Sequence, residues 1–302
     1  DAPIVQEGMK NNLCNHALIE RGDVEEAFNQ CEVVVERSYT TPFLEHGFME
    51  PESGVCFKTE DDGITLLIHT QTVFDVRSWI AENLDMPEEK IRVVQIPQGG
   101  SFGGKEDPIF EVHLALAAKI TGRPCKLVLT RTESLRIHVK RHPTWMTFKT
   151  GADKDGNILA VKASVTSDTG CYVSLGADVL ANMVLFCAGP YFVPNLYLEG
   201  QAWFTNNVLG GAMRGFGVNQ IAFGLEQNID DMARQLGIDP FDIRIRNGLR
   251  AGQPTASDDV LQEGIAGVVD TVEAARATFL EHKENLIARK NGGNTKIGIG
   301  VA

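Results

Sequence analysis

The chain has 302 residues, 43% hydrophobic and 23% charged, a composition typical of a globular protein with one large domain or two ordinary ones. Lys and Arg number 28 against 40 Asp and Glu, and the formal charge of −12 disfavours nucleic acid or an anionic membrane as main partner, because both attract basic surfaces. No apolar run approaches the roughly 18 residues of a membrane span.

The N-terminal half of the chain has alternating helical and strand-like patterns. Asp23 is a good N-cap for a short helix, and Asp107 with Pro108 is expected to start a longer helix after a glycine loop. The apolar spacing predicts these elements in chain order: helix 22–31, strand 32–41, strand 64–72, helix 73–84, strand 91–96, helix 108–120 and strand 125–130. The order strand, helix, strand allows parallel pairing through a crossover helix.

The C-terminal half begins with two strands joined by a turn at 154–157. The remaining expected elements are strand 196–205, helix 219–236 closed by Gly237, a short helix from Pro240, helix 271–289 and strand 296–302. Because helices and strands mix without strict alternation, we expect an α+β fold with mixed sheets and packed helices.

None of the six cysteines belongs to a CxxC pair, and neighbouring cysteines lie 16 or more positions apart. This spacing argues against an iron–sulfur cluster or a structural zinc site carried by this chain. Reduced thiols in a cytoplasmic protein are therefore the expectation. The sequence starts DAPIVQEGMK, without an initiator Met or a signal-peptide pattern, so we expect a fragment or a processed piece.

The segment QGGSFGGKED, at 98–107, matches the first part of the phosphate-loop motif GxxxxGK. Glu106 stands where that motif needs Ser or Thr for magnesium, and its charge would repel phosphates, which argues against a nucleoside triphosphate loop. Gly103 and Gly104 still allow the backbone to approach a ligand closely. An oxyanion or a pterin is one candidate occupant, and a tight turn between strand and helix is the structural alternative.

A second glycine loop, LGGAMRGFGVNQ at 209–220, leads directly into a helix. It carries Arg214 and Phe216 between glycines, a setting unlike that of core residues. Glycines let peptide N–H groups contact a ligand, and Phe216 is suited to form one wall of a pocket.

These loops, with EHGFMEP at 45–51, RHP at 141–143, GPYFVPNL at 189–196 and DDMARQLGIDPFDIRIRN at 230–247, resemble the molybdenum-binding part of the xanthine dehydrogenase and aldehyde oxidase family. The resemblance covers about 20–302, in the family's order. It implies hydroxylation of an N-heterocycle or aldehyde with oxygen from water, at a molybdenum held by molybdopterin. No direct metal ligand is therefore expected on this chain. The resemblance also implies that the two glycine loops converge on one cavity shaped for molybdopterin.

The resemblance implies cofactor contacts at Gln71, Gly100, Phe102, Gly103 and Arg214. Gln71 matches a glutamine whose amide donates a hydrogen bond to the molybdenum centre, although a polar residue at a strand end is its structural alternative. Arg214 belongs to a loop whose backbone lies against that centre. Arg214 and Glu106 are the predicted catalytic residues.

Glu106, Asn182 and Phe216 are the predicted substrate contacts. Glu106 matches a carboxylate that binds and polarises purines, and its structural alternative is a helix N-terminal glutamate favoured by the dipole. Phe216 matches a ring that stacks on the substrate, with an ordinary core aromatic as the alternative. Asn182 stands where purine enzymes carry an arginine that stabilises developing negative charge, which argues against a xanthine-type mechanism.

The resemblance divides the chain into a linker at 1–20, a first molybdenum cofactor-binding domain at 21–250, and, at 251–302, a linker helix with the first strand of a truncated second such domain. The family's general base, a glutamate in that second domain, lies beyond residue 302. Activity therefore needs the remaining molybdenum-binding domain, with 2Fe–2S and FAD expected on partner domains or subunits. A cytosine dinucleotide form of the cofactor and a homodimer of the full enzyme both stay open.

Two other hypotheses stand beside this one. A non-catalytic binding or assembly module would keep the fold without the chemistry, and the joint retention of the site residues argues against it. The second hypothesis is a nucleotide-binding protein that uses the GxxxxGK segment. This hypothesis predicts specific binding of ATP with magnesium.

Overall fold

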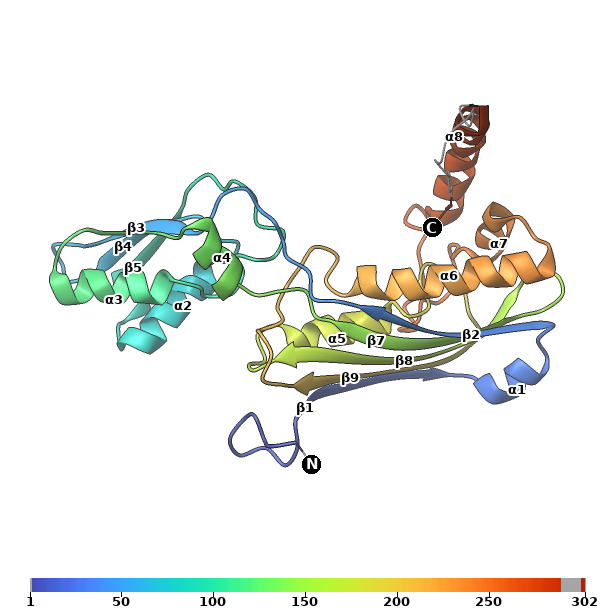
Figure 1. Cartoon of the computed structure of the whole chain (residues 1–302), viewed down its shortest axis with the longest axis horizontal. Coiled ribbons are helices and arrows are strands. Elements are labelled where there is room, and N and C mark those ends of the chain that lie inside the picture. The colour runs from blue at the N-terminus through green and yellow to red at the C-terminus, as the bar shows by residue number, and fades with distance from the viewer. Residues whose placement is uncertain (1, 289–299, 302) are drawn as a thin grey trace.

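The computed structural model of the chain describes residues 2–288 and 300–301. Figure 1 shows two lobes side by side along the longest axis, each built on one sheet. The chain passes from the larger lobe to the smaller one between residues 41 and 53 and returns between residues 137 and 144. Whatever lies at the junction of the lobes is therefore reached by chain segments far apart in sequence.

The larger lobe contains a five-stranded sheet in the order β1-β9-β8-β7-β2, in which β8 and β9 are parallel and the other neighbours antiparallel. Its strands are β1 (Leu13–Arg21), β2 (Val33–Thr41), β7 (Thr144–Ala152), β8 (Ile158–Gly170) and β9 (Asn195–Phe204). The turn expected at 154–157 joins β7 to β8, so the predicted hairpin is confirmed.

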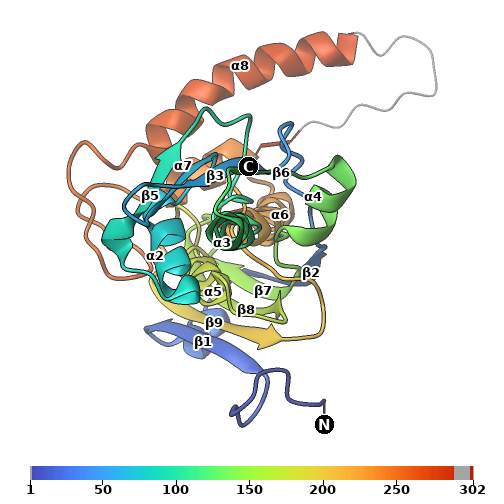
Figure 2. The same ribbon diagram turned by 90° about the vertical axis from the view of Figure 1, so that its left-hand side faces the viewer.

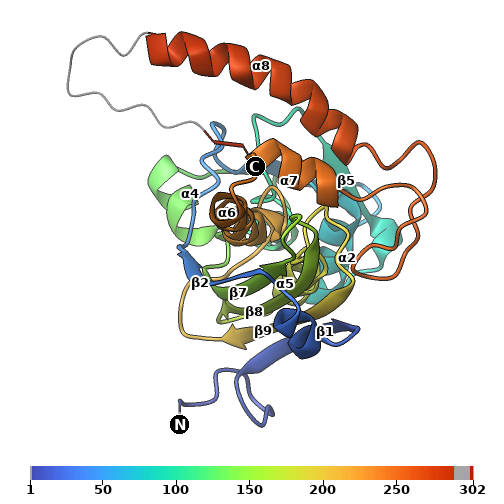
Figure 3. The same cartoon turned by 90° about the vertical axis from the view of Figure 1, so that its right-hand side faces the viewer.

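Two helices cover one face of this sheet (Figure 3). Helix α5 (Gly176–Leu185) packs on β1 and β9, and α6 (Val218–Leu236) packs on β2 and β7. The apolar stripe predicted for α6 is confirmed, because Ile221, Leu225 and Ile229 are buried in the core of the lobe. On the opposite face lies α1 (Val24–Asn29), which Asp23 caps as expected by accepting from the Glu26 N–H.

The smaller lobe has a four-stranded sheet in the order β5-β4-β3-β6. Its elements are β3 (Ser53–Lys58), β4 (Ile64–Ile68), α2 (Val73–Leu84), the 3-10 turn η1 (Glu88–Lys90), β5 (Ile91–Gln95), α3 (Glu111–Thr121) and β6 (Cys125–Val128). The predicted parallel pairing through a crossover helix is confirmed for β4 and β5. Helices α2 and α3 pack together on this sheet (Figure 2). They enclose a hydrophobic core that is separate from the core of the larger lobe.

Three further helices complete the described part of the chain: α4 (Arg131–Ile137), α7 (Pro240–Asn247) and α8 (Val268–Ala288). Thr130 and Glu133 form a capping box that starts α4, at the beginning of the return from the smaller lobe. Helix α8 extends outward from the larger lobe beside α7 (Figure 1). Within residues 2–288 and 300–301, no helix has the length and apolarity to cross a membrane.

The α+β expectation is confirmed, but some local expectations were wrong. The linker expected at 1–20 includes most of β1, which pairs with β9 along the sheet edge. The helix expected from residue 108 begins at Glu111, because Asp107 accepts a hydrogen bond from the Ser174 hydroxyl at 2.6 Å instead of capping the helix. Strand β3 and helices α4 and α5 were not anticipated, and the expected strand at 296–302 lies largely outside the described residues.

A buried asparagine ties α6 to the sheet. Asn228 is fully buried, accepts a hydrogen bond from the Tyr39 hydroxyl at 2.6 Å, and donates to the carbonyl oxygen of Phe148 at 3.0 Å. Its amide thus pairs with groups from β2 and β7, on which the helix packs. Truncation would leave the Tyr39 hydroxyl without this acceptor and would open a cavity.

We expect Asn228→Ala to lower the free energy of unfolding by about 2–3 kcal/mol, measured by urea denaturation. The matched control is Asn29→Ala, at an exposed position of α1, which should change that free energy by less than about 0.5 kcal/mol. Equal losses in the two variants would contradict the role given to the buried amide.

Candidate functional site

The two glycine loops meet at the junction of the lobes. Loop 98–107 leads from β5 towards α3, and loop 209–217 leads from β9 into α6. Between them lies an open pocket of about 410 Å³ lined by Gln71, Ser101, Phe102, Gly103, Glu106, Ala212, Met213, Arg214, Gly215 and Phe216. The predicted sharing of one cavity is therefore confirmed, and Phe102 and Phe216 both line it.

The loops contact each other through their backbones. The Arg214 N–H donates a hydrogen bond to the Phe102 carbonyl oxygen at 2.9 Å. Gly103 has a φ of +97°, and a Cβ atom there would lie 2.7 Å from the Ala212 carbonyl oxygen. A side chain at this position would therefore separate the two walls of the pocket.

Both aromatic residues of the pocket adopt left-handed backbone conformations. The φ angle is 54° at Phe102 and 45° at Phe216. For a bulky residue this conformation costs about 1–2 kcal/mol, which the surrounding contacts must offset. Backbone strain of this kind clusters at ligand sites, and here it holds both rings at the rim of one cavity.

Gln71 is held by hydrogen bonds at both ends of its amide. Its Oε1 accepts from the Gly103 N–H at 2.9 Å, and its Nε2 donates to Glu106 Oε1 at 3.0 Å. The acceptor end is thus bonded to the loop backbone, and the donor end is bonded to Glu106, which lines the same pocket. This orientation suits a side chain that offers N–H to a ligand oxygen.

Glu106 lies beside a second carboxyl group, Asp107. Burial raises the pKa of Glu106, and the neighbouring Asp107 carboxylate raises it further. Burial also raises the pKa of Asp107, although the hydrogen bond from Ser174 opposes that shift. The protonated form of Glu106 is therefore favoured more than in an exposed glutamate, and this form can donate a hydrogen bond to a ring nitrogen.

Asn182 lies on α5, directly behind the second loop. Its Nδ2 donates to the Phe216 carbonyl oxygen at 2.6 Å, so it supports the backbone of that aromatic residue. The Arg214 carbonyl oxygen in turn accepts from Arg141 Nη2 at 2.8 Å. Gly100 is outside the pocket lining and packs against Phe48.

The lysine of the GxxxxGK segment does not reach the pocket. Lys105 is only 2% exposed, and its Nζ donates to the Glu50 carbonyl oxygen at 2.8 Å. The helix N-terminus expected at Asp107 is also missing, since Glu111 caps the N–H groups of Ile109 and Phe110 with its own carboxylate. The phosphate-loop interpretation therefore loses both features on which it depends.

Sequence reasoning gave no role to a polar cluster behind the loops. His46 donates to the Ala212 carbonyl oxygen, and Arg141 bonds the second loop from the other side. Both lie in motifs already noted, EHGFMEP and RHP, so the signal was present in the sequence. Their function became visible only from the contacts they make.

A sequence model of the molybdopterin cofactor-binding domain family matches residues 5–248, a span that contains both loops and every residue of the pocket. The chain belongs to this family. The residues of the pocket fit such a cofactor, because two glycine-rich walls let backbone atoms approach and the amide donor of Gln71 faces the cavity.

Similar proteins support the assignment. The chain is 39% identical to the nicotinate dehydrogenase large molybdopterin subunit of Eubacterium barkeri over 281 residues, which is 93% of this chain and 65% of that protein. It is 32% identical to the xanthine dehydrogenase molybdenum-binding subunit of Escherichia coli over 311 residues, 100% of this chain and 40% of that protein. The aldehyde oxidoreductase structure from Desulfovibrio gigas superposes with a TM-score of 0.91, at 28% identity, over 98% of this chain and 32% of that one. The chain thus spans between about a third and two thirds of the length of these relatives.

We expect Gly103→Ala to destabilise the chain by about 3 kcal/mol, because the new Cβ meets a backbone carbonyl that cannot rotate away. Gly122 is the matched control, since it also has a positive φ but a Cβ there would meet nothing within 4 Å. Gly122→Ala should cost about 1 kcal/mol for backbone strain alone. Thermal and urea unfolding measure the loss in free energy of unfolding for each variant. Equal losses would show that the backbones of the two loops are not in close contact at Gly103.

Proposed function

We propose that this chain supplies half of the active-site pocket of a larger molybdenum oxidoreductase that hydroxylates an N-heterocycle or an aldehyde. The observation that carries the proposal is the hydrogen bond between Arg214 and Phe102, which joins two distant glycine loops around one pocket. The family match supports molybdopterin as the ligand of that pocket, because the matched span contains every residue of its lining. When bound, the cofactor supplies the redox and oxygen-transfer chemistry.

The residues of this chain would orient cofactor and substrate. Gln71 is placed to donate its amide N–H to a cofactor oxygen, because Gly103 already occupies the other end of that amide. Phe216 is placed to stack on an aromatic substrate, and Asn182 fixes the backbone that carries the ring. Phe102, Gly103 and Arg214 would form the surface on which the cofactor rests.

Glu106 makes an N-heterocycle the preferred substrate class. A carboxyl group with a raised pKa can accept from a ring N–H when ionised and donate to an unprotonated ring nitrogen when protonated, whereas an aldehyde has no N–H and offers only an acceptor oxygen. Asn182 carries no positive charge, so it would not stabilise an anionic intermediate as an arginine does. Glu106 thus favours an N-heterocycle such as a purine or a pyridine carboxylate, and Asn182 argues against xanthine itself.

The rest of the machinery would lie outside this chain. We assign the general base to a glutamate of the second molybdenum-binding domain, and electron transfer to 2Fe–2S and FAD groups on partner domains or subunits. The first molybdenum-binding domain would occupy 21–250 together with residues 13–20, which belong to β1 of the same sheet, and a connecting segment at 251–302 would follow. The same proposal includes a cytoplasmic location, a cytosine dinucleotide form of the pterin cofactor, and a homodimer of the whole enzyme.

The chain expressed with its downstream segment and partners should contain molybdenum and molybdopterin in equal amounts, measured by elemental analysis and by fluorescence of the released pterin. Gln71→Ala should lower both contents severalfold, because a donor to the cofactor is lost. His113→Ala, on α3, serves as the control and should leave them unchanged. A well-folded preparation without molybdenum would instead identify a non-catalytic module.

In the assembled enzyme, Glu106→Gln should lower kcat/KM for an N-heterocycle about 100-fold, since a group with a raised pKa would be replaced by one that cannot exchange a proton. Turnover of a simple aldehyde should fall by less than about threefold, because that substrate has no ring nitrogen to bind. Equal losses on both substrates would place Glu106 in the cofactor site and not in the substrate site.

A further inference from the structure

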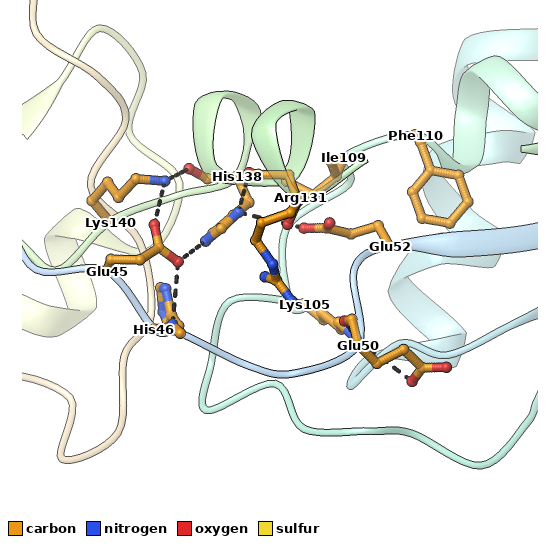
Figure 4. A network of polar contacts seen from close by, with 12 residues as sticks. Glu45, His46, Glu50, Glu52, Lys105, Ile109, Phe110, Arg131, His138 and Lys140 are labelled. Carbon is orange, nitrogen blue, oxygen red and sulfur yellow. Dashed lines mark hydrogen bonds and ion pairs between the residues drawn. The ribbon is translucent and has the colours of Figure 1, made fainter. Parts of the chain in front are cut away.

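The two segments that connect the lobes, the outgoing crossing between residues 41 and 53 and the returning crossing between residues 137 and 144, are hydrogen-bonded to each other. The outgoing crossing contains Leu44 and Glu45, and the returning crossing contains His138, Lys140 and Arg141. The Arg141 N–H donates to the Leu44 carbonyl oxygen at 3.0 Å. This backbone bridge brings the side chains of the two crossings into one cluster (Figure 4).

Glu45 is the centre of that cluster. Its Oε1 lies 2.6 Å from His138 Nε2, and its Oε2 lies 3.1 Å from Lys140 Nζ. The His138 side chain is fully buried, and its Nδ1 bonds the Ser134 carbonyl oxygen at the end of α4. Since Glu45 is about one third exposed, these two contacts are partly shielded from solvent and hold a defined geometry.

The returning crossing is in turn bonded to the second glycine loop. The Lys140 N–H donates to the Leu209 carbonyl oxygen at 3.0 Å, and the Gly211 N–H donates to the Lys140 carbonyl oxygen at 2.9 Å. Motion of this crossing would therefore move the start of the loop that carries Arg214 and Phe216.

His46 touches both loops at once. Its Nε2 donates to the Ala212 carbonyl oxygen at 2.7 Å, and a Cβ at Gly104 would lie 3.0 Å from its ring carbon Cγ. The residue is 8% exposed, and burial lowers the pKa of its imidazole, which favours the neutral ring. The ring is thus a spacer between the backbone of the first loop and that of the second.

Glu45, His46 and His138 also bring ligand atoms within 4.8 Å of one another, as metal ligands do. The ammonium group of Lys140 already pairs with the Glu45 carboxylate. The 2.6 Å between Glu45 Oε1 and His138 Nε2 is a hydrogen-bond distance. A cation would have to compete with this ammonium group. The contacts are those of a brace, not of a metal centre.

We propose that Glu45 and His46 are positioning residues that brace the lobe junction and set the spacing of the two glycine loops. The inference rests on the proposed function only in that these loops line the cofactor and substrate pocket. The brace itself is a property of this chain, so it can be tested in the absence of cofactor.

The test is amide hydrogen exchange on the full chain, followed in peptides that cover 209–217. His46→Phe keeps a ring of similar size but removes the N–H donor, and exchange in these peptides should rise roughly five- to tenfold. His46→Gln retains an N–H donor that can reach the same carbonyl and should restore most of the protection. His16→Gln, which alters an exposed pair with Glu199, is the control and should leave exchange unchanged.

Peptides from β8 and β9 separate positioning from general destabilisation. If exchange in them rises as much as in 209–217, or if His46→Phe leaves 209–217 unchanged, the brace is refuted. Should His46→Phe not fold, Glu45→Gln gives the same test, with an expected rise of about threefold in 209–217. If the exchange test refutes the brace, the molybdenum content still tests the proposed function. If the protein lacks molybdenum, the exchange test of the brace is still valid.

Discussion

A pocket formed by two separate loops exists only if their backbones come within bonding distance, and the hydrogen bond from Arg214 to Phe102 marks that approach at 2.9 Å. Gly103 makes the approach sterically allowed, because any side chain there would meet the Ala212 carbonyl. Glu106, Phe102 and Phe216 lie on these two loops, and the Gly103 N–H holds the side-chain amide of Gln71. The chemical character of the pocket thus depends on a contact that involves no side chain.

The regular elements could largely be predicted from the sequence, since they follow local rules. Asp23 caps α1, the hairpin at 154–157 joins β7 to β8, and the apolar stripe of α6 faces the sheet. The failures have tertiary causes. Asp107 and Pro108 form a good local helix start, but Ser174 of the other lobe binds the Asp107 carboxylate, and the helix begins at Glu111.

The composition of the pocket could be predicted, but its geometry could not. Each glycine loop is visible in the sequence, and the resemblance to molybdenum enzymes gave the reason to bring them together. Nothing in local spacing indicates that Asn182 holds the Phe216 carbonyl or that Lys105 turns away from the pocket to bond the Glu50 carbonyl. Such contacts join residues of distant segments, and no periodicity encodes them.

The two lobes have separate hydrophobic cores, one beneath α6 and one between α2, α3 and the smaller sheet. Most of the pocket lining belongs to neither core, although Phe216 also packs against the core beneath α6. Substitutions of the other lining side chains, the close-packed glycines excepted, can therefore alter the cavity without opening a void in the interior of either lobe. The shape of the cavity can thus change in evolution while the folding stability of the two lobes changes little.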